Sequence, residues 1–600
     1  MATTGSERST YSTAWQEWWQ FNGDPYLRLR TLVSGLSSTT GGGTQIEARQ
    51  GYGPTSGQIQ ATVVPALRAA LMAADNTDVV RGAMIALARI GKSNELPGLT
   101  LDQTAKFYLK EDHQPSTESA LIALGLRADA SSVDLLLNLV RNNEAGQELR
   151  DDQSVDSRTR VFATYALGLL SRRADDPKLS AKIGRELTRC FVTDETATFE
   201  MHVAMMLSLG LAPDDECDGE IAVDLTSLSD KEAHLCRGTQ IAALVDYFED
   251  TERPYELRAH AAVPLARLAL NASEPYKMAI AKVLQEPLES RSKEHPSVRH
   301  SCVVALGVLG DSDEDPTDQA IRETLFSSAS RGKDLLQRLS MVSLAKVAAR
   351  VGDSDNTGSG LRKVQKFLSK KLASGRGDIR SWAAMALSIL GHDHNRETAE
   401  IPEGITNILR DSLNARSEDR AAASALAIGV LRDYDSYSSL LKHIGPKEAA
   451  HVRSYSALAL GMIGAREAIE PLTKLVSEED LSPMVLGSAS IALRLLGHRE
   501  AASTLLAQLD DLEETDDQIA LISAAGVLGD STSIELLIEL MGDDERDDAL
   551  RGSAALALGV LCDTRTEAWT SDISSDINYN LLTWTLRDPF GDGLGVLDMR

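Results

Sequence analysis

The 600-residue sequence repeats one short pattern along almost its whole length. Each copy has an apolar residue and an arginine, then seven residues, then a small residue followed by an apolar pair. A pattern that recurs at a roughly fixed period is typical of a repeat protein, in which similar units stack on each other. Four copies show the pattern most clearly: VRHSCVVALGVLGD from Val298, IRSWAAMALSILGH from Ile379, VRSYSALALGMIGA from Val452 and LRGSAALALGVLCD from Leu550.

The small residue of the pattern recurs in thirteen units, with Arg494 as the one large exception. Successive positions lie 32 to 56 residues apart, and the last four steps are 32 or 33 residues. The sequence therefore predicts about thirteen stacked units over residues 58–565. The positions are Ala88, Gly125, Gly168, Gly210, Ala266, Gly307, Ala345, Ser388, Gly429, Gly461, Arg494, Gly526 and Gly559.

Within a unit, apolar residues fall every three or four positions, as on one face of a helix. Gly464 stands where a glycine commonly ends a helix, so a unit of about 33 residues is predicted to hold two helices and two turns. The predicted fold class is all-α, an α-solenoid of about thirteen stacked helix pairs. The two stripes of one unit are Ala457, Leu460 and Ile463, then Ala468, Leu472 and Leu475.

Glycine inside a helix costs roughly 1 kcal/mol relative to alanine, so its recurrence needs a reason. A small side chain lets the neighbouring helix approach closely, and stacking gives each pair the core that it cannot bury alone. The glycines predicted to be structural include Gly168, Gly307, Gly461 and Gly559. The result is predicted to be an α-superhelix, whose curvature the sequence does not give.

A column of arginines lies eight residues before the small position. Several members follow an acidic residue closely, as in Asp156, Glu256, Asp378 and Asp548. These acidic neighbours favour a structural ladder of hydrogen bonds along the stack over a basic binding stripe. The column consists of Arg160, Arg258, Arg299, Arg380, Arg453 and Arg551.

The pattern VRxxAxxALGxLGD resembles HEAT repeats, and the resemblance covers about residues 60–565. The C-terminal units of 32 or 33 residues are most similar to the HEAT-like repeats named after phycobilisome bilin lyases. This resemblance implies scaffolding, partner binding or assembly, and it implies no single reaction, because the motif residues are packing residues.

The charge balance excludes several classes of partner. The chain has 61 Lys and Arg against 88 Asp and Glu, a net charge of −27. Phosphate backbones and anionic membrane surfaces both need clustered basic residues, so no nucleic acid is expected. An acidic surface instead attracts protein partners with basic patches.

Location is predicted from three absences in the sequence. The five cysteines are scattered and show no CxxC spacing, which favours a reducing compartment. The sequence has no uninterrupted apolar run of 18 residues, so no membrane span is predicted. The N-terminus shows no signal peptide. We therefore expect a cytoplasmic protein; an exported or periplasmic one is the alternative if a signal peptide was removed.

Two acidic linkers are weak candidates for a metal site. The first carries Asp311, Asp313 and Asp315, and the second carries Asp353 and Asp355. An EF-hand loop needs a bidentate glutamate at its twelfth position, where these linkers have Arg322 and Val364. The favoured interpretation is a pair of solvated acidic linkers, with a weak cation site as the alternative.

Histidine pairs are weaker metal candidates still. One HEAT-repeat hydroxylase family binds iron through His-Glu dipeptides, but here His260 and His300 are followed by Ala261 and Ser301. Both histidines are expected on helix surfaces or in the stack. Zinc needs four ligands, and each remaining group offers only two: His392 with His394, and His234 with Cys236.

No catalytic motif is present, because the chain lacks GxSxG, GxxxxGK[ST] and HExxH. We therefore expect a non-enzymatic scaffold that binds protein partners on the concave face of its superhelix, without a cofactor. The alternatives are a lyase-like enzyme that handles a prosthetic group, and an exported or envelope structural protein.

The segments outside the regular repeats complete the predicted organisation. Trp15, Trp18 and Trp19 share one helix face in a predicted helix pair over residues 12–33. This pair is expected to cap the exposed core of the first repeat, with an aromatic docking site for a partner as the alternative. The other segments are a disordered start at 1–11, a loop at 34–57, an insertion at about 211–257 and a capping tail at 566–600.

Overall fold

The computed structural model describes most of the chain. The described residues are 14–27, 54–73, 76–91, 101–111, 113–215, 235–270, 272–352, 360–478, 481–498, 501–529, 531–563, 565, 568–588 and 595–599. In these ranges the regular secondary structure is entirely helical. The predicted disordered start at 1–11 and most of the predicted loop at 34–57 lie outside the described residues.

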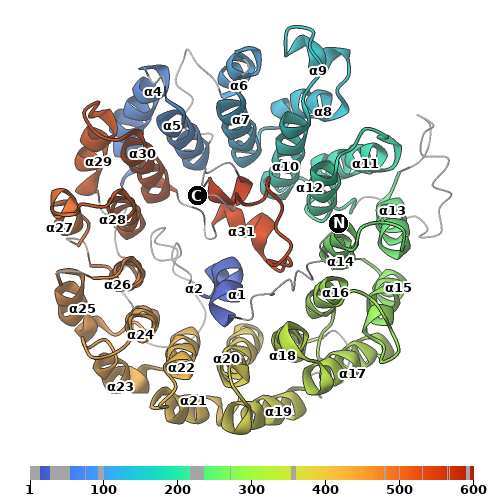
Figure 1. Ribbon diagram of the computed structural model, residues 1–600, viewed down its shortest axis with the longest axis vertical. Coiled ribbons are helices and arrows are strands. Elements are labelled where there is room, and N and C mark those ends of the chain that lie inside the picture. Colours follow the sequence, from blue (N-terminus) through green and yellow to red (C-terminus); the bar gives the residue numbers. More distant parts are fainter. Residues whose placement is uncertain are drawn as a thin grey trace, which may run out of the picture.

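The helices form thirteen consecutive pairs, each an outer helix followed by an inner one (Figure 1). The outer helices are α4 (Val64–Ala73), α6 (Leu101–Lys110), α8 (Val133–Arg141), α11 (Pro177–Thr193), α13 (Arg237–Glu249), α15 (Glu274–Gln285), α17 (Pro316–Arg331), α19 (Leu361–Ser374), α21 (Ile405–Leu413), α23 (Tyr437–Lys442), α25 (Ile469–Val476), α27 (Ala501–Leu506) and α29 (Ser533–Gly542). The inner helices are α5 (Thr77–Ile90), α7 (Gln114–Arg127), α10 (Ser157–Ala174), α12 (Phe199–Leu209), α14 (Tyr255–Ala269), α16 (Pro296–Leu309), α18 (Asp334–Ala349), α20 (Ile379–Thr398), α22 (Glu418–Val430), α24 (Ala450–Met462), α26 (Pro483–Leu495), α28 (Thr515–Leu528) and α30 (Asp548–Cys562). The predicted all-α solenoid of helix pairs is confirmed.

Helix ends follow local sequence signals. Helix α24 ends just before Gly464, which has φ +75°. The Ala465 N–H donates to the Leu460 carbonyl, as in the common glycine-terminated helix end.

One predicted boundary was wrong. The supposed insertion at 211–257 contains α13, a regular outer helix, so only residues between α12 and α13 are extra.

The recurring glycines all make one kind of contact. Each packs on the inner helix of the next repeat, against the residue two positions before that repeat's own small position. At Gly526, for example, a Cβ atom would lie 2.7 Å from the Cα of Ala557. The tightest contacts are Gly125 on Ala166, Gly168 on Ser208, Gly307 on Ser343, Gly429 on Ala459, Gly461 on Ala492 and Gly526 on Ala557, and Gly210 makes a looser one on Pro264, at 3.0 Å. Only hydrogen fits at these positions, because the partner atoms include main chain.

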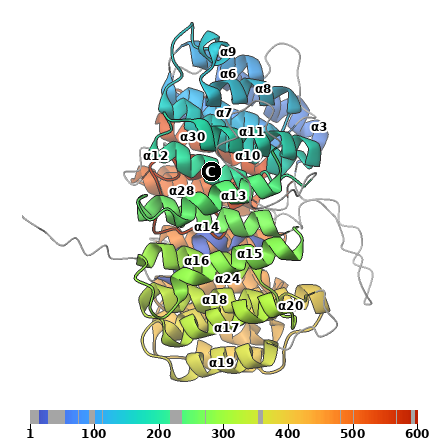
Figure 2. The ribbon, with the colours of Figure 1, turned by 90° about the vertical axis from the view of Figure 1, so that its right-hand side faces the viewer.

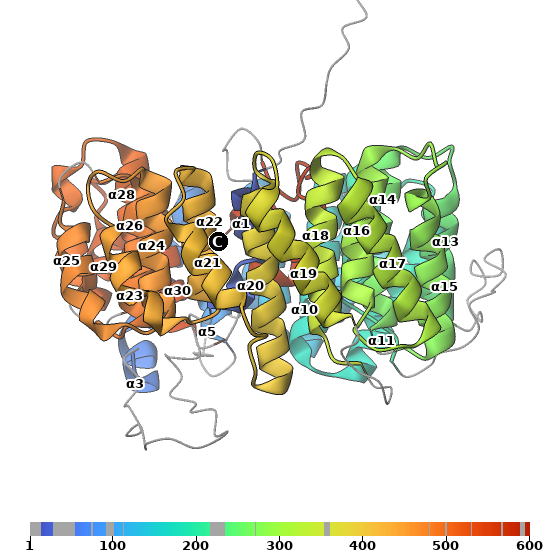
Figure 3. The ribbon, with the colours of Figure 1, turned by 90° about the horizontal axis from the view of Figure 1, so that it is seen from below.

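The last repeat makes the same contact with the first. A Cβ on Gly559 would lie 2.6 Å from the Cα of Ala86, which is two positions before Ala88. Gly82 of α5 also lies against the main chain of Gly552 of α30. The solenoid therefore closes into a ring of thirteen pairs, seen along its axis in Figure 1. Figures 2 and 3 show the same ring from two sides, with its helices running across its thickness.

Polar contacts complete the seam between α30 and α5. Arg89 pairs with Asp563 at 3.2 Å, with side chains only 5% and 2% exposed. Asn76 donates to Asp548 at 3.0 Å. Removal of either member of a buried ion pair leaves the other charge uncompensated, so the seam depends on both residues.

Described helices near both ends of the chain lie inside the ring. Helices α1 (Trp15–Asn22) and α2 (Asp24–Leu27), together with α31 (Trp569–Ser574), occupy its centre in Figure 1. The prediction that the N-terminal helix pair caps one end of the stack is therefore wrong, as is the same prediction for the tail. A closed ring has no free end to cap, so these segments fill the lumen instead.

Candidate functional sites

The three N-terminal tryptophans are buried in the lumen, with exposed fractions of 1% for Trp15, 3% for Trp18 and 8% for Trp19. Trp15 donates its indole N–H to Asp419 of α22 at 2.8 Å. Its ring lies 4.8 Å from that of Tyr455 on α24. The alternative of an exposed aromatic docking site is contradicted by this burial.

Helix α2 continues the aromatic packing. The ring of Tyr26 lies 5.9 Å from Trp19 and 4.9 Å from His392 of α20. Burial raises the pKa of Tyr26 well above its usual value. His392, which the sequence offered as half of a zinc pair, therefore belongs to the wall against which the N-terminal segment packs.

The C-terminal segment is held in the lumen by charges. Asp572 of α31 pairs with Arg173 of α10 at 3.1 Å, and Asp576 pairs with Lys346 of α18 at 2.5 Å. Arg267 of α14 donates to the main-chain carbonyls of Asp572 at 3.2 Å and of Ser575 at 2.6 Å. These contacts cross from the tail to three different inner helices, so the tail braces one half of the ring.

The two terminal segments also contact each other. Ser571 donates to Asp24 at 2.5 Å, and the Asp576 N–H donates to the Asn22 side chain at 2.9 Å. The rings of Phe21 and Tyr579 stack 5.8 Å apart. The concave face, which was expected to bind partners, is thus contacted by the chain's own terminal segments.

His260 and His300, the candidates for an iron site, lie on the inner wall with exposed fractions of 4% and 3%. They were expected on helix surfaces or in the stack; burial contradicts the first of these. His260 Nε2 lies 2.9 Å from the carbonyl of Leu581 in the tail. Burial lowers the pKa of His260 to about 4. No metal group among the described residues includes either histidine.

The lowered pKa of His260 predicts loss of stability in acid. An unfolded chain takes up a proton near pH 6.5, whereas the folded protein does so only near its pKa of about 4, so the free energy of unfolding falls as pH falls between these values. We expect His260→Asn to make that fall shallower, by up to ~1.4 kcal/mol per pH unit. Urea unfolding at several pH values measures it, with His394→Asn as the control. An unchanged slope in His260→Asn would contradict the assignment.

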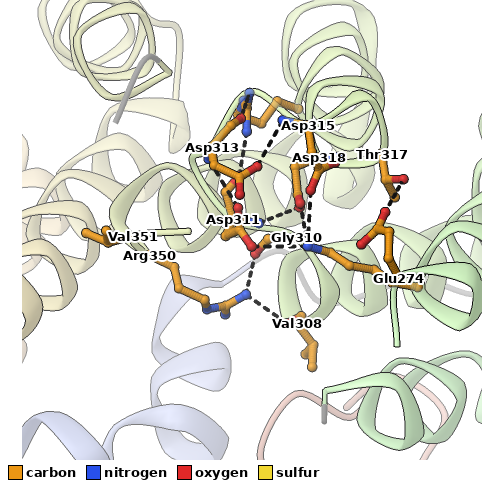
Figure 4. A network of polar contacts seen from close by, with 12 residues as sticks. Glu274, Val308, Gly310, Asp311, Asp313, Asp315, Thr317, Asp318, Arg350 and Val351 are labelled. Carbon is orange, nitrogen blue, oxygen red and sulfur yellow. Dashed lines mark hydrogen bonds and ion pairs between the residues drawn. The ribbon is translucent and has the colours of Figure 1, made fainter. Parts of the chain in front are cut away.

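The first acidic linker forms a compact turn rather than a solvated one (Figure 4). Asp313 and Asp318 are fully buried, and oxygens of Asp311, Asp313 and Asp318 lie within 4.8 Å of one another. The Asp311 N–H donates to Asp318 at 2.7 Å. Asp315 caps the first turn of α17 by accepting from the Asp318 N–H at 2.8 Å. The expectation of a solvated linker was therefore wrong here.

A lysine already supplies positive charge to this cluster. Lys277 of α15 contacts Asp318 and lies 3.1 Å from Asp311. Although burial opposes it, the hydrogen bond and charge of Asp318 hold the pKa of Lys277 above its usual value. Burial and a hydrogen bond with Asp315 raise the pKa of Asp318 to about 7. The ammonium group of Lys277 thus supplies the positive charge that a metal ion would bring to this cluster.

Removal of the lysine tests this arrangement. We expect Lys277→Met to destabilise the protein by about 3 kcal/mol, because it leaves buried carboxylates without their cation. Millimolar calcium is then expected to restore part of the melting temperature of the variant and to leave that of the wild type unchanged. Differential scanning calorimetry measures both, with the exposed Lys366→Met as the matched control. A rise in the wild-type melting temperature with calcium would contradict the prediction.

The second linker candidates, Asp353 and Asp355, lie outside the described residues, as does His234.

The arginine column lies at one edge of the ring, where outer helices end and inner helices begin. In five of the six members, the guanidinium Nε donates to a main-chain carbonyl within two residues of the end of the preceding outer helix. The bonds run from Arg160 to Val140 (2.9 Å), Arg258 to Phe248 (2.7 Å), Arg380 to Gly375 (2.8 Å), Arg453 to Ile444 (3.2 Å) and Arg551 to Met541 (3.2 Å). Arg299 differs, since its buried Nε has no hydrogen-bond partner in the structure as described.

The acidic partners of these arginines come mainly from further along the chain. Arg160 pairs with Asp194, Arg258 with Glu294 at 2.7 Å, and Arg453 with Glu478. Each acid lies in the corresponding turn of the following repeat. The acidic residues just before each arginine in the sequence, which suggested a ladder, mostly do not pair with that arginine. Among the described ion pairs of the column, only Arg551 pairs with its own upstream neighbour, Asp548, at 3.2 Å. The contacts thus join successive repeats along this edge.

A groove of about 730 Å³ opens at the same edge, between the turn after α25 and the turn after α27. Its floor is apolar and its rim is acidic. The carboxylates of Asp511 and Asp517 have no ion-pair or hydrogen-bond partner among the described residues, whereas Glu478 is paired with Arg453. The apolar lining consists of Val476, Leu481, Pro483, Leu486, Leu512 and Leu521. This groove was not predicted from the sequence, although the acid-rich run LDDLEETDDQ from Leu509 is a readable signal.

None of the described helices is long and apolar enough to span a bilayer.

Comparison with known proteins finds one family match. The model of the PBS lyase HEAT-like repeat matches residues 452–478, which is the unit of α24 and α25. No curated protein matches the chain.

Several solved structures are similar in part. Human deoxyhypusine hydroxylase is 17% identical over 43% of this chain and 96% of its own, with a TM-score of 0.21. Importin beta is 12% identical over 85% of this chain and 64% of its own, with a TM-score of 0.40. Kap121p bound to Nup53p is 13% identical over 83% of this chain and 55% of its own, with a TM-score of 0.37.

The family assignment rests on the repeat pattern, the matched unit and the thirteen helix pairs of the structure itself. This chain is a HEAT-like repeat protein.

Proposed function

We propose that this protein is a non-enzymatic scaffold that binds a basic protein partner in the acid-rimmed groove between α25 and α28. The observation that supports this most directly is the groove itself, with a volume of about 730 Å³ and an apolar floor. A partner segment with an apolar face and flanking basic residues matches it in both respects.

Because the lumen is occupied by the terminal segments, we expect partners to bind at the edge of the ring. The sequence alone favoured the concave face. Because α1, α2 and α31 occupy the centre, a partner that used the inner wall would first have to displace buried residues such as Trp15. The edge of the ring needs no such displacement.

Electrostatics favours a basic partner. The whole chain carries a net charge of −27, and Asp511 and Asp517 bring to the groove two carboxylates that lack a partner among the described residues. Complementary charge speeds encounter and fixes orientation more than it adds affinity, and the apolar floor would supply the affinity. A salt-sensitive association with an apolar component is therefore expected.

The test is affinity purification from the native cells at low and high salt, with co-purifying proteins identified by mass spectrometry. We expect the Asp511→Asn/Asp517→Asn double variant and the Leu512→Ser variant each to lose the principal partner. The control Asp411→Asn/Glu535→Gln removes the same charge from exposed positions on α21 and α29. Retention of the partner by both groove variants, or an association indifferent to salt, would contradict the proposal.

A further inference from the structure

A second pocket, of about 310 Å³, opens at the same edge of the ring between the turn after α11 and the turn after α13. Three aromatic rings form its wall. Tyr247 lies 5.0 Å from Phe191 and 5.3 Å from His202, and Phe191 lies 5.9 Å from His202, between ring centroids. Clustered aromatic faces attract cations, which bind above the ring.

One of these rings already has a cation over it. Arg253, in the turn after α13, holds its guanidinium carbon 3.9 Å from the centroid of the Tyr247 ring. It also pairs with Asp250 at 3.1 Å, and its side chain remains 37% exposed. The contact shows that the Tyr247 face accepts a guanidinium group, and the exposure shows that solvent reaches the group that occupies it.

The mouth of the pocket has surplus negative charge. Asp194 is paired with Arg160, but Glu195 and Asp246 are exposed, and neither has a partner within the described part of the chain. Burial lowers the pKa of His202, so its ring is uncharged at neutral pH and does not repel a cation. The pocket thus combines π faces with two carboxylates that have no partner among the described residues.

We propose that this pocket binds the guanidinium group of an arginine side chain on a basic polypeptide, which displaces Arg253 from the face of Tyr247. Arginine suits it better than lysine, since a planar guanidinium stacks on rings and bonds to carboxylates with two N–H groups at once. The inference shares with the proposed function the assumption that the ligand is a basic polypeptide, but it concerns a different surface from the groove.

The first test uses isothermal titration calorimetry of the full chain with the blocked peptide acetyl-Gly-Arg-Arg-Gly-amide and its lysine counterpart. We expect the arginine peptide to bind more tightly. Glu195→Gln/Asp246→Asn should weaken that binding by about tenfold, corresponding to ~1.4 kcal/mol, while the equally charged control Asp411→Asn/Glu535→Gln leaves it unchanged. Equal weakening by both double variants, or equal binding of the lysine peptide, would overturn the assignment.

The second test removes Arg253, the side chain that covers the ring of Tyr247 in the structure. Arg253→Gln vacates the ring of Tyr247 and frees Asp250, so we expect it to tighten binding of the arginine peptide. A purely structural role for Arg253 gives no such gain. If neither the wild type nor Arg253→Gln binds the peptide at millimolar concentration, the proposal is wrong.

The groove variant Asp511→Asn/Asp517→Asn separates the two proposals. It should bind the arginine peptide as the wild type does, even if it loses the partner. If the groove variant loses the arginine peptide while the pocket variant retains it, the proposal for the pocket is contradicted and the proposal for the groove stands. Retention of the partner by the groove variant, with the peptide effects as expected, would leave the pocket standing and contradict the groove.

Discussion

Replacing Gly559 by valine should open the ring. The new side chain would meet the Cα of Ala86, to which even a Cβ would lie only 2.6 Å away, so α30 must move off α5. Overpacking alone costs about 1–3 kcal/mol, and here the cost is larger because a displaced seam exposes the cores of the first and last repeats. We expect a lower melting temperature and a larger radius of gyration in small-angle X-ray scattering.

Two other glycines serve as matched controls for the seam. Gly461→Val blocks the equivalent contact inside the solenoid, where the chain itself still links α24 to α26, so stability should fall with little change in the radius of gyration. Gly487 lies in α26 with nothing near its missing Cβ, and Gly487→Ala should stabilise by roughly 0.5–1 kcal/mol through helix propensity. Unchanged scattering in Gly559→Val would mean that the ring does not depend on this contact.

Trp15→Ala should have the second large effect. It removes a ring that is 1% exposed together with the hydrogen bond to Asp419. Truncation of a buried Trp or Phe to alanine costs about 3–5 kcal/mol of stability, so the melting temperature should fall strongly. Trp584, which is 55% exposed, provides the control: Trp584→Ala should cost less than ~1 kcal/mol. A variant Trp15→Ala with unchanged stability would show that the lumen packing is not structural.

Much of this fold can be predicted from the sequence because the repeat fixes local geometry. Helical spacing indicates each pair, and the small column indicates where neighbouring helices touch. The glycine at Gly464 correctly marks a helix end. These features depend on residues close in sequence or on one contact that recurs in every unit.

Closure of the ring depends on something that no single unit contains. Curvature is the sum of thirteen small rotations between neighbouring pairs, and residue types do not fix such angles closely enough to sum them. One signal was nevertheless present: terminal repeats of an open solenoid need a polar outer face, whereas α5 and α30 carry Gly82 and Gly552 at their interface.

The candidate sites were harder to predict because their residues come from separate turns. Lys277 stands 34 positions before Asp311 in the chain, yet the two side chains lie 3.1 Å apart. Tyr247 and Phe191 meet only because α11 and α13 are neighbours in the ring. The acidic residues are visible in the sequence, but the cation or ring opposite them is not.

Closure also changes how the molecule can unfold. A linear array of repeats loses its terminal units first, since each of those has only one neighbour to hold it. Here every helix pair has two neighbours, so no unit can separate until two interfaces have broken. Partial unfolding is therefore penalised everywhere around the circle, and slow hydrogen exchange should be spread evenly over the inner helices rather than declining toward α5 and α30.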